Sequence, residues 1–595
     1  MLKYASRTNL TLPLVTTLRA SSRRDLRGDL VAGLTVGAML VPQAMAYALL
    51  AGLPPEVGLY ASTIPVIAYA LFGTSRQLAV GPVAIVSLLT ATALAPLVEE
   101  GTASYLEAAA LLALMVGVVH LVLGFGRLGF LVNFLSHSVL VGFSAAAAII
   151  IGFSQAKHIL GISVARKDHF YETVAEVFAG LGDANAATLT LGLAAVAVLV
   201  VLKRFAPRAP GALVVVVGST LAVSLLDLES RGVRVVGDVP DSLPMFAIPG
   251  LDGSLIGSLL PTALVITLVG FMESIAVAKV YARRNCYDVD ANQELISLGM
   301  ANTTAGLFGG YPVTGGFSRT AVNAAAGART PLASLVTAAI VLLTIVLLTP
   351  LFVSLPNAAL GAIIIVAVAG LVDTAEMRHI AKVKRSDLVG LSVAFVATLA
   401  IGIELGILVA VVASMLVVFA RMSKPHTAVL GRLVGTTTFR NVDRFPDTVQ
   451  VPGVRVVRVD ASVSFANAAY IKRLLLGQAA AVDSEAAVLV LDASGINDID
   501  ATGAAAIAEV VQSFEDRAVS LHLAAVKGPV RDVLQSAGIW DRLAGRIHAS
   551  IEEAMTTIQE TGPSANADAA DSARIKVDGQ RRSETSPTPG AVDHG

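Results

Sequence analysis

Long apolar runs dominate the chain from about residue 30 to 420, and they constrain its fold more than any other feature. A helix needs roughly 20 apolar residues to cross a bilayer, and fewer where it is broken inside the protein. Seven such segments lie at 30–50, 57–72, 78–98, 104–124, 129–153, 186–202 and 211–226. Seven more lie at 257–280, 294–309, 311–327, 331–350, 357–372, 386–401 and 403–421. The chain is therefore predicted to be a polytopic α-helical membrane protein.

Composition agrees with this interpretation and excludes several other classes of protein. Of the 595 residues, 55% are hydrophobic and 15% charged, whereas a soluble domain carries roughly 25% charged residues. A net charge of −1 provides no field to recruit nucleic acid. Cys286 is the single cysteine, so no disulfide or Cys-x-x-Cys pair can form. The sequence shows no nucleophile–base pair or metal-ligand cluster, and we expect neither an enzyme nor a bound metal or cofactor.

The distribution of charge predicts how the chain is inserted. With a cytoplasmic N-terminus, every second loop should be basic. Those loops hold Arg76, Arg127, Lys203, Arg204, Arg208, Lys279, Arg283, Arg284, Arg329, Arg378, Lys382, Lys384 and Arg385. The opposite loops are acidic at Glu56, Glu99, Glu100, Glu107 and Glu404, and contain bases only at 154–185 and 227–256. We expect a cytoplasmic segment at 1–28, a transmembrane domain of about fourteen spans at 29–421, and both termini on the cytoplasmic side of the inner (plasma) membrane.

Two breaks in the apolar pattern occupy matching places in the two halves. An odd number of spans in each half makes the halves insert in opposite senses, as in the inverted repeats of secondary transporters, whose sites lie where helices are broken. The third span opens with Gly81, Pro82 and Val83, and the tenth contains Pro312, Thr314, Gly315 and Gly316. Proline suits a helix that begins inside the membrane, and glycine lets the preceding backbone approach a ligand. The alternative is that glycine and proline are simply common in membrane helices.

The start of a half-helix is a site for an anion, because its backbone N–H groups are free and the helix dipole is positive there. Arg319 is the only arginine or lysine that lies within a span rather than at its edge, and charge at that depth usually marks function or a structural ion pair. The other candidate contacts are the neighbouring Phe317, the hydroxyls of Ser87, Thr314 and Ser318, and the pair Gln43 and Tyr47, four residues apart on one helical face. For Gln43 and Tyr47, ordinary packing between helices remains an alternative.

Glu273 is the most informative acid, because it lies near the middle of an apolar span. A carboxyl group there can carry a proton, bind a cation or pair with Arg319; we favour the proton carrier. Carrying an anion inward against a potential of 100 mV costs about 2.3 kcal/mol per charge. An importer of a divalent anion therefore needs cotransported cations or an exchanged anion.

The C-terminal third has the pattern of a soluble α/β domain. We expect a linker at 422–450, a cytoplasmic domain at 451–561, and a disordered tail at 562–595. The predicted strands of the cytoplasmic domain lie at 454–459, 487–491 and 519–525. Its predicted helices lie at 466–481, 502–517, 529–537 and 550–560.

Several ordered motifs resemble the SulP anion-permease family, also called the sulfate-permease and prestin–pendrin group. They are VPQAMAYA at 41–48, AGLPPEVGLYA at 51–61, VGPVA at 80–84 and GLFGGYPVTGGFSRTAVN at 306–323. The resemblance implies a seven-plus-seven inverted repeat like that of uracil permeases, with core and gate domains, in a homodimer. It places an anion between the third and tenth half-helices, with Gln43, Tyr47, Ser318 and Arg319 as contacts and Glu273 as the acid of proton-coupled carriers. Val277 and Phe317 offer no side-chain oxygen, which argues against a sodium site.

The run from Asp492 to Gly503 resembles the signature loop of the STAS domain, which is shared by such carriers and anti-sigma-factor antagonists. Thr502 falls where the antagonists carry a phosphorylated serine, so a regulatory phosphosite and a cytoplasmic regulator of the domain are possible. The simpler alternative is that Thr502 or Asp500 caps the following helix.

These observations together predict a secondary active transporter of a small inorganic anion, most simply proton-coupled sulfate uptake by alternating access. Bicarbonate or C4-dicarboxylate symport is the alternative among transporters. The alternative of a different class is an anion sensor that signals through the STAS domain.

Overall fold

The computed structural model describes residues 13–19, 21–130, 136–164, 169–206, 210–237, 242–481, 488–517 and 519–560. The chain forms two compact units, Met1–Met415 and Leu416–Gly595, which are described separately. The predicted tail at 562–595 and the first twelve residues of the predicted N-terminal segment lie outside the described residues.

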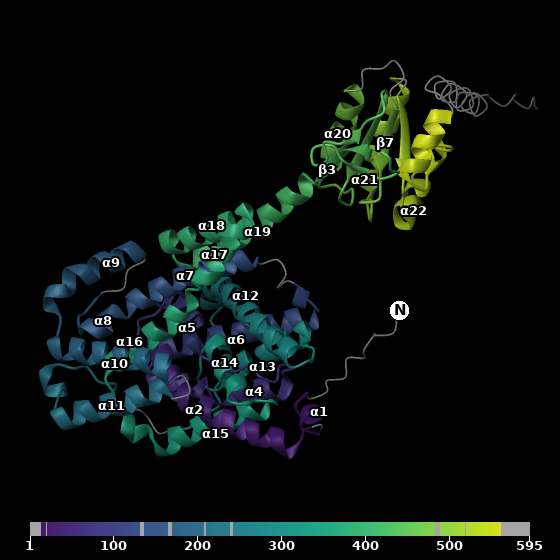
Figure 1. Cartoon of the computed structure of the whole chain (residues 1–595). Helices are drawn as coiled ribbons and strands as arrows, with labels where there is room; N and C mark the ends of the chain where they lie inside the picture. The colour runs from purple at the N-terminus through teal and green to yellow at the C-terminus, as the bar shows by residue number, and fades with distance from the viewer. Residues whose placement is uncertain are drawn as a thin grey trace, which may run out of the picture. The chain divides into compact units, whose positions relative to one another are not determined.

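The first unit is helical throughout, and its first half follows the predicted spans (Figure 1). A capping box between Ser22 and Asp25 starts the first long helix, and Thr102 and Asn185 cap two others. The spanning elements are α2 (Arg23–Leu50), α3 (Pro55–Tyr60) with α4 (Ile64–Phe72), α5 (Ala84–Leu94), α6 (Ala103–Phe125), α7 (His137–Ser154), α10 (Ala186–Phe205) and α11 (Gly211–Leu226). Shorter helices lie at α1 (Pro13–Arg19), α8 (Ala156–Leu160) and α9 (Phe170–Ala179).

The second half repeats this series of seven. Its elements are α12 (Gly253–Arg284), α13 (Ala291–Leu307), α14 (Phe317–Ala325), α15 (Leu332–Leu347), α16 (Asn357–Val368), α18 (Arg385–Ile401) and α19 (Ile403–Ser423). The short α17 (Thr374–Val383) precedes α18. Among the described residues, seven helices or joined helix pairs are long and apolar enough to cross a membrane, and four shorter helices are also apolar.

Helices from the two halves pack against one another, so neither half is an independent body. α13 packs on α6 and α4, α15 on α2, and α18 on α7. The approach is closest at glycines: a Cβ at Gly142 would lie 2.2 Å from the Leu391 carbonyl oxygen. Small residues allow such contacts where no hydrophobic effect drives helices together. In Figure 1, α5 and α14 lie in the interior of the unit, while α10 and α11 lie at its edge.

The second unit is an α/β domain with one mixed sheet. Its strands are β3 (Thr427–Leu433), β4 (Phe439–Asn441), β5 (Thr448–Val449), β6 (Val454–Val459), β7 (Val488–Asp492), β8 (Ser520–Ala524) and β9 (Ile547–His548). The order is β4-β3-β6-β7-β8-β9, with β5 beside β3. Strands β6 to β9 run parallel, and β3 is antiparallel to β6. The helices are α20 (Ala468–Ala480), α21 (Ala501–Glu515), α22 (Gly528–Ser536), α23 (Ile539–Arg542) and 551–560.

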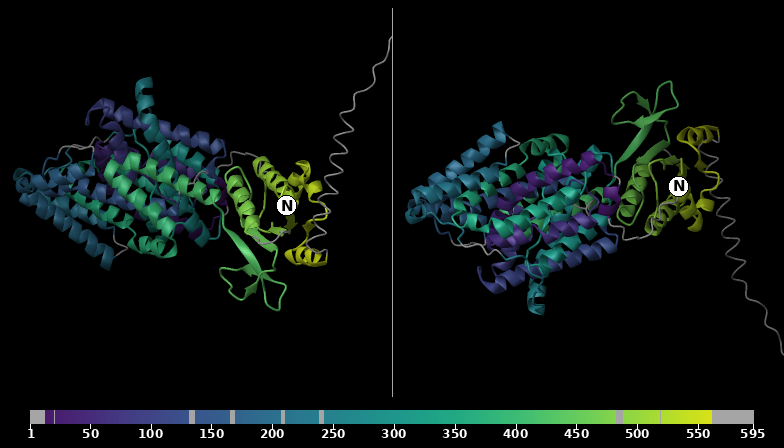
Figure 2. Two further views of the ribbon diagram at one scale, coloured as in Figure 1. Left: turned by 90° about the horizontal axis from the view of Figure 1, so that it is seen from above. Right: turned by 90° about the horizontal axis from the view of Figure 1, so that it is seen from below.

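The predicted strands and helices of this domain agree with the structure to within two residues, but the predicted linker at 422–450 does not. That segment begins inside α19 and then forms β3, β4 and β5. Residues Thr427–Leu430 pair with β6, and the β3–β4 hairpin extends from the sheet (Figure 2). The alternate apolar residues Ala428 and Leu430 are buried against the sheet's own core, which explains the pairing.

Candidate functional site

The two breaks predicted from the sequence meet in the structure. β1 (Val80–Gly81) and β2 (Thr314–Gly315) form an antiparallel pair, with Val80 opposite Gly315 and Gly81 opposite Thr314. The Gly316 N–H also donates to the Ala79 carbonyl over 3.1 Å. Each strand leads directly into a short helix, α5 or α14. Both helices therefore begin at one point inside the first unit, and neither has a side-chain cap.

Asn302 of α13 holds the backbone that leads into β2. Its side-chain oxygen accepts from the Val313 N–H over 2.8 Å, and its NH₂ donates to the Val313 carbonyl over 2.9 Å. Thr314 donates to the Gly270 carbonyl over 2.6 Å, and Ser274 accepts from the Gly315 N–H over 2.9 Å. These groups are all buried, so the bonds fix an extended segment that no regular ladder could hold.

The first break is held by the second half of the chain in return. Thr320 accepts from the Ala79 N–H over 3.1 Å, and Asn323 donates to the Gln77 carbonyl over 2.8 Å. Both residues belong to α14, so the two half-helices position each other.

A cavity of about 60 Å³ lies at the starts of these two helices. One buried water needs roughly 10–15 Å³ on this measure, so the cavity is large enough for a small ion. Eight of the predicted site residues line it: Gln43, Tyr47, Val83, Glu273, Gly316, Phe317, Ser318 and Arg319. Prediction from the sequence missed Ala84, Ile85, Ala367, Val368 and Leu371, which also line it. These five carry no polar side chain, so no chemical signal could have selected them.

Arg319 is the dominant polar group of this cavity. Its side chain is 2% exposed, and one guanidinium nitrogen donates to the Pro82 carbonyl at the end of the first break. The other two guanidinium nitrogens, Nε and Nη2, are buried without a hydrogen-bond partner among the described residues. An unpaired buried donor costs about 1–3 kcal/mol, and more when it is charged. A bound anion would remove that cost.

Glu273 lies in the same cavity and is 5% exposed. None of the ion pairs and hydrogen bonds among the described residues includes its carboxyl group. The structure therefore does not show the static pair with Arg319 that the sequence allowed. The acid and the base face one small space from α12 and α14.

Five predicted site residues lie beside the cavity rather than on it. Gly81 and Gly315 belong to the strand pair behind it, where Gly81 has a φ of 152°, and Pro82 directly follows β1. Thr314 is bonded to Gly270 and Ser274. Ser87 shares a hydrogen bond of 3.0 Å with the Tyr311 hydroxyl. These side chains position the half-helices, and Tyr311 was not identified from the sequence.

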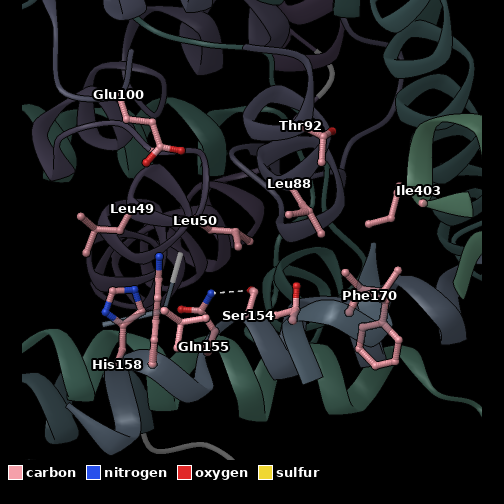
Figure 3. Close-up of a pocket in the computed structure, with 16 residues that line it drawn as sticks. Leu49, Leu50, Leu88, Thr92, Glu100, Ser154, Gln155, His158, Phe170 and Ile403 are labelled. Atoms are coloured by element: carbon pink, nitrogen blue, oxygen red, sulfur yellow. Dashed lines mark hydrogen bonds between the residues drawn. The ribbon is translucent and has the colours of Figure 1, made fainter. Parts of the chain in front are cut away.

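A larger cavity of about 250 Å³ lies nearer the C-terminal ends of α2 and α5 (Figure 3). Leu49, Leu50, Leu88 and Thr92 line it, and it shares no lining residue with the Arg319 cavity. α7 and α8 contribute further polar groups, among them Ser154, Gln155, Lys157 and His158.

In the second unit, the predicted phosphosite Thr502 is exposed in the first turn of α21. The helix cap is Asp500, whose carboxylate accepts from the Gly503 N–H over 2.7 Å and the Phe465 N–H over 2.8 Å. These two backbone hydrogen bonds lower the pKa of Asp500. The simpler alternative, that Thr502 or Asp500 caps the helix, is therefore confirmed for Asp500.

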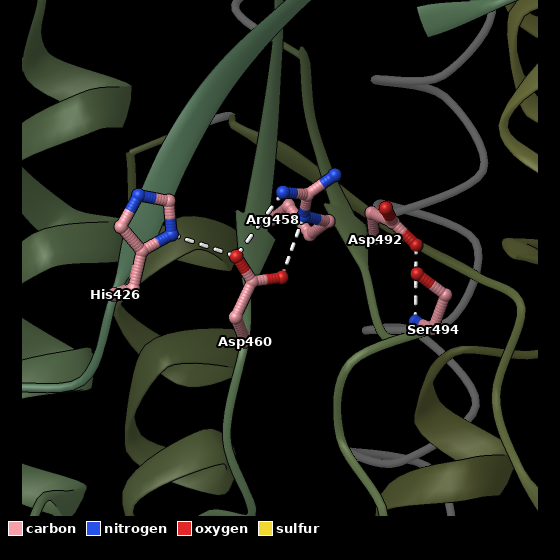
Figure 4. Close-up of polar contacts among 5 residues, drawn as sticks. All are labelled: His426, Arg458, Asp460, Asp492 and Ser494. Atoms are coloured by element: carbon pink, nitrogen blue, oxygen red, sulfur yellow. Dashed lines mark hydrogen bonds and ion pairs between the residues drawn. The ribbon is translucent and has the colours of Figure 1, made fainter. Parts of the chain in front are cut away.

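A second set of polar contacts lies at the ends of β6 and β7 (Figure 4). Asp460 accepts from Arg458 over 2.6 Å and shares a bond of 2.7 Å with His426. Partial burial raises the pKa of Asp460, but the hydrogen bonds from Arg458 and His426 outweigh it and lower the pKa overall. Asp492 accepts from the Ser494 N–H over 3.0 Å and so turns the chain after β7. The bonds of Asp460 join the end of β6 to the segment before β3, whereas the bond of Asp492 stays within the loop after β7.

Two helices broken inside an apolar helical unit, with a buried guanidinium between them that has two nitrogens unpartnered among the described residues, define a membrane carrier for anions rather than an enzyme. The chain belongs to the sulfate permease family, whose sequence profile matches residues 26–394. The STAS domain profile matches residues 445–554 of the second unit. The fold is accordingly the seven-plus-seven membrane fold of this family with a STAS domain.

Similar proteins extend over most of the chain. A probable sulfate transporter 4.2 of Arabidopsis thaliana is 41% identical over 524 residues, covering 85% of this chain and 76% of that protein. A probable sulfate transporter of Mycobacterium tuberculosis is 37% identical over 531 residues, covering 89% and 95%. The solved structure of murine Slc26a9, an anion transporter in the inward-facing state, has a TM-score of 0.86 at 25% identity and covers 94% of this chain and 96% of that one.

Proposed function

We propose that this protein imports sulfate together with protons, binding the anion between the first turns of α5 and α14. The observation that carries the proposal is the Arg319 guanidinium, buried with two unpartnered nitrogens on a cavity of ionic size. A tetrahedral oxyanion matches a planar fork of donors better than a halide does. The names of the similar plant and bacterial transporters also favour sulfate.

Glu273 is the proton carrier in this proposal. It lies in the cavity without an ion-pair partner among the described residues, so it is free to change its protonation state. Each proton that accompanies sulfate offsets one of its two charges, which saves about 2.3 kcal/mol per 100 mV of opposing potential. A sodium ion is less suited to this cavity, because Val277 and Phe317 offer no oxygen ligand.

Transport by alternating access would use the two separate cavities. The cavity at Leu50 and Leu88 lies at the helix ends predicted to face outward, and the Arg319 cavity includes Leu371 near the predicted inner end of its span. A movement of α5 and α14 relative to α16 would connect the anion first to one side and then to the other. This proposal includes the arrangement of the two halves of the membrane domain as an inverted repeat.

The remaining assignments complete the proposal. The carrier works as a homodimer in the inner membrane with both termini in the cytoplasm. The STAS domain, extending from β3 through helix 551–560, takes a cytoplasmic regulator that acts at the exposed Thr502. The domain boundary therefore falls between α19 and β3 rather than at 451.

Uptake of labelled sulfate into proteoliposomes tests the function. We expect an inward proton gradient to drive accumulation and a sodium gradient at constant pH to drive none. Glu273→Gln should abolish accumulation while sulfate binding remains measurable, whereas Glu56→Gln, outside the cavity, should transport normally. Retained proton-driven accumulation in Glu273→Gln would refute its role. Uptake of bicarbonate or succinate in preference to sulfate would identify a different substrate. If no anion is taken up, the result would favour an anion sensor over a transporter.

A further inference from the structure

A third cavity, of about 170 Å³, lies at the end of the first unit where α2 begins and α12 and α14 end. It shares no lining residue with the Arg319 cavity or with the cavity at Leu50. Every side chain that lines it is polar. No part of α16, α18 or α19 contributes to it, so it does not lie between the elements proposed to open and close.

Two arginines face this cavity, Arg76 and Arg329. Within the described residues, neither forms an ion pair with a carboxylate. The Arg76 guanidinium lies over the Tyr287 ring, 4.7 Å from its centre, and Arg329 reaches only the Asn285 side-chain oxygen, at 3.5 Å. The Thr17 hydroxyl adds a further donor, whereas the Ser21 and Thr330 hydroxyls already donate to the Thr17 carbonyl and the Asp29 carboxylate.

The backbone that carries each arginine is held by a buried carboxylate from the other half of the chain. Asp29 of α2 accepts from the Arg329 and Thr330 N–H groups over 2.7 and 2.9 Å. Glu294 of α13 accepts from the Thr74 and Ser75 N–H groups, just before Arg76, over 2.7 and 2.9 Å. Both carboxylates are 0% exposed. They fix the backbone of the two turns that carry the exposed arginine side chains, so less of the site has to be ordered when a ligand binds.

Charge decides the kind of ligand. Two guanidinium groups face the cavity and one carboxylate, Asp25, is on its wall. The Asp25 Oδ2 atom already accepts from the Ser22 N–H and hydroxyl in the cap of α2. Two guanidinium groups at one cavity suit a phosphate or sulfate group, which accepts several charge-assisted hydrogen bonds at once.

We infer that this cavity is a second oxyanion site, in which Arg76 and Arg329 bind a sulfate or phosphate group outside the transport path. The group can belong to a free inorganic anion or to the headgroup of an anionic lipid at the membrane edge. Gln77 joins the site to the transport cavity, because its side chain donates to the Ala328 carbonyl while its own carbonyl accepts from Asn323 of α14. Occupation of the site therefore stabilises the turn that precedes β1.

Binding to the full-length protein in detergent tests the inference. In an Arg319→Ala background, which weakens the transport site, inorganic phosphate and sulfate should still raise the unfolding temperature. Adding Arg76→Gln and Arg329→Gln should raise the half-saturating concentration of phosphate and of sulfate at least about tenfold, because charge-assisted hydrogen bonds to the anion are lost. Arg76→Lys with Arg329→Lys should retain most of the binding. The matched control is Arg283→Gln with Arg284→Gln, which removes two exposed charges near the end of α12 but outside the cavity.

A second arm separates the two sources of the group. Native mass spectrometry in mixed phosphatidylglycerol and phosphatidylcholine micelles should show phosphatidylglycerol adducts that the Gln pair loses if a lipid headgroup is the ligand. If a free anion is the ligand, only the phosphate and sulfate titrations respond to that pair. Each single Gln variant gives the same test should the pair fail to fold. Unchanged anion affinity and unchanged lipid adducts in the Gln variants would overturn the inference.

Discussion

The two half-helices that meet inside the first unit differ in what they offer an anion. α5 starts with Ala84, Ile85 and Val86 and presents only backbone N–H groups and apolar side chains to the cavity. α14 starts with Phe317, Ser318 and Arg319 and adds a hydroxyl and a guanidinium. The first helix therefore acts through its dipole, whereas the second combines a dipole with fixed side-chain donors.

This difference teaches which half decides selectivity. Backbone amides at a helix start attract any anion, but the directional donors on α14 can distinguish a tetrahedral oxyanion from a sphere. The hydroxyl on α5, Ser87, is bonded to Tyr311 outside the cavity and adds no such donor. Substitutions in α14 should therefore change anion affinity more than matched substitutions in α5.

The largest effect is expected at Arg319. Arg319→Ala should weaken sulfate binding about 10–100-fold, because hydrogen bonds from a charged group contribute about 1.5–3 kcal/mol. Isothermal calorimetry on the purified protein measures this directly. Arg319→Lys keeps the positive charge but not the forked guanidinium donors, so its sulfate affinity should lie between those of the original protein and Arg319→Ala. An Arg319→Ala affinity within twofold of the original would place the anion elsewhere.

Asn302 should have the next largest effect. Asn302→Ala leaves the Val313 N–H and carbonyl unpaired in a buried segment, at a cost of about 1–3 kcal/mol for each group. We expect a lower unfolding temperature and sulfate affinity reduced about three- to tenfold. Thr304→Ala is the matched control, since Thr304 bonds only to carbonyls of its own helix. Equal behaviour of the two variants would show that the segment before β2 needs no external support.

The serine pair compares the helices most directly. Ser318→Ala should weaken sulfate binding about fivefold, in line with about 1 kcal/mol for a neutral hydrogen bond. Ser87→Ala should leave affinity within twofold and lower only the unfolding temperature, because its partner is Tyr311. The comparison breaks if Ser87→Ala lowers affinity more than Ser318→Ala.

The smallest effect is expected from a cap added to α5. Val83 stands at the cap position without a side-chain hydrogen bond, so the first N–H groups of α5 are free for a ligand. Val83→Thr has nearly the same shape, but its hydroxyl can accept from one of those groups. Competition with the anion should weaken sulfate binding about twofold in the same calorimetric titration. A tighter complex would show that the backbone of α5 does not bind the anion.

Several features of the fold and site could be predicted from the sequence because their signals are local. Apolar runs predicted the spans, and the lone charge of Arg319 within such a run marked the cavity. Other features depend on pairing between distant segments. Ser87 was assigned to the anion from its distance to Pro82, yet its partner is a tyrosine 224 residues later. Asn302 lies in a short, polar span, and only the β2 backbone shows its role.

The same reasoning explains the error in the second unit. Residues 422–450 form short strands with few consecutive apolar residues, so the segment resembled a linker. The segment is ordered because β3 pairs with β6 in an antiparallel ladder. Strands β3, β4 and β5 are only two to seven residues long, which is too short for a periodic hydrophobic pattern to reveal them. The parallel strands of the same sheet were easier to predict from the sequence, because each is a continuous buried run followed by a helix.

Anomalous scattering from selenate, a heavier analogue of sulfate, would locate the carried ion without assumptions about affinity. For crystals of the full-length protein soaked in selenate, we expect a selenium peak between the first turns of α5 and α14, within hydrogen-bonding reach of the free Arg319 nitrogens. A peak at that point that disappears in Arg319→Ala would confirm the binding mode. Selenium density only at other positions, with the space beside Arg319 unoccupied in the same crystals, would contradict it.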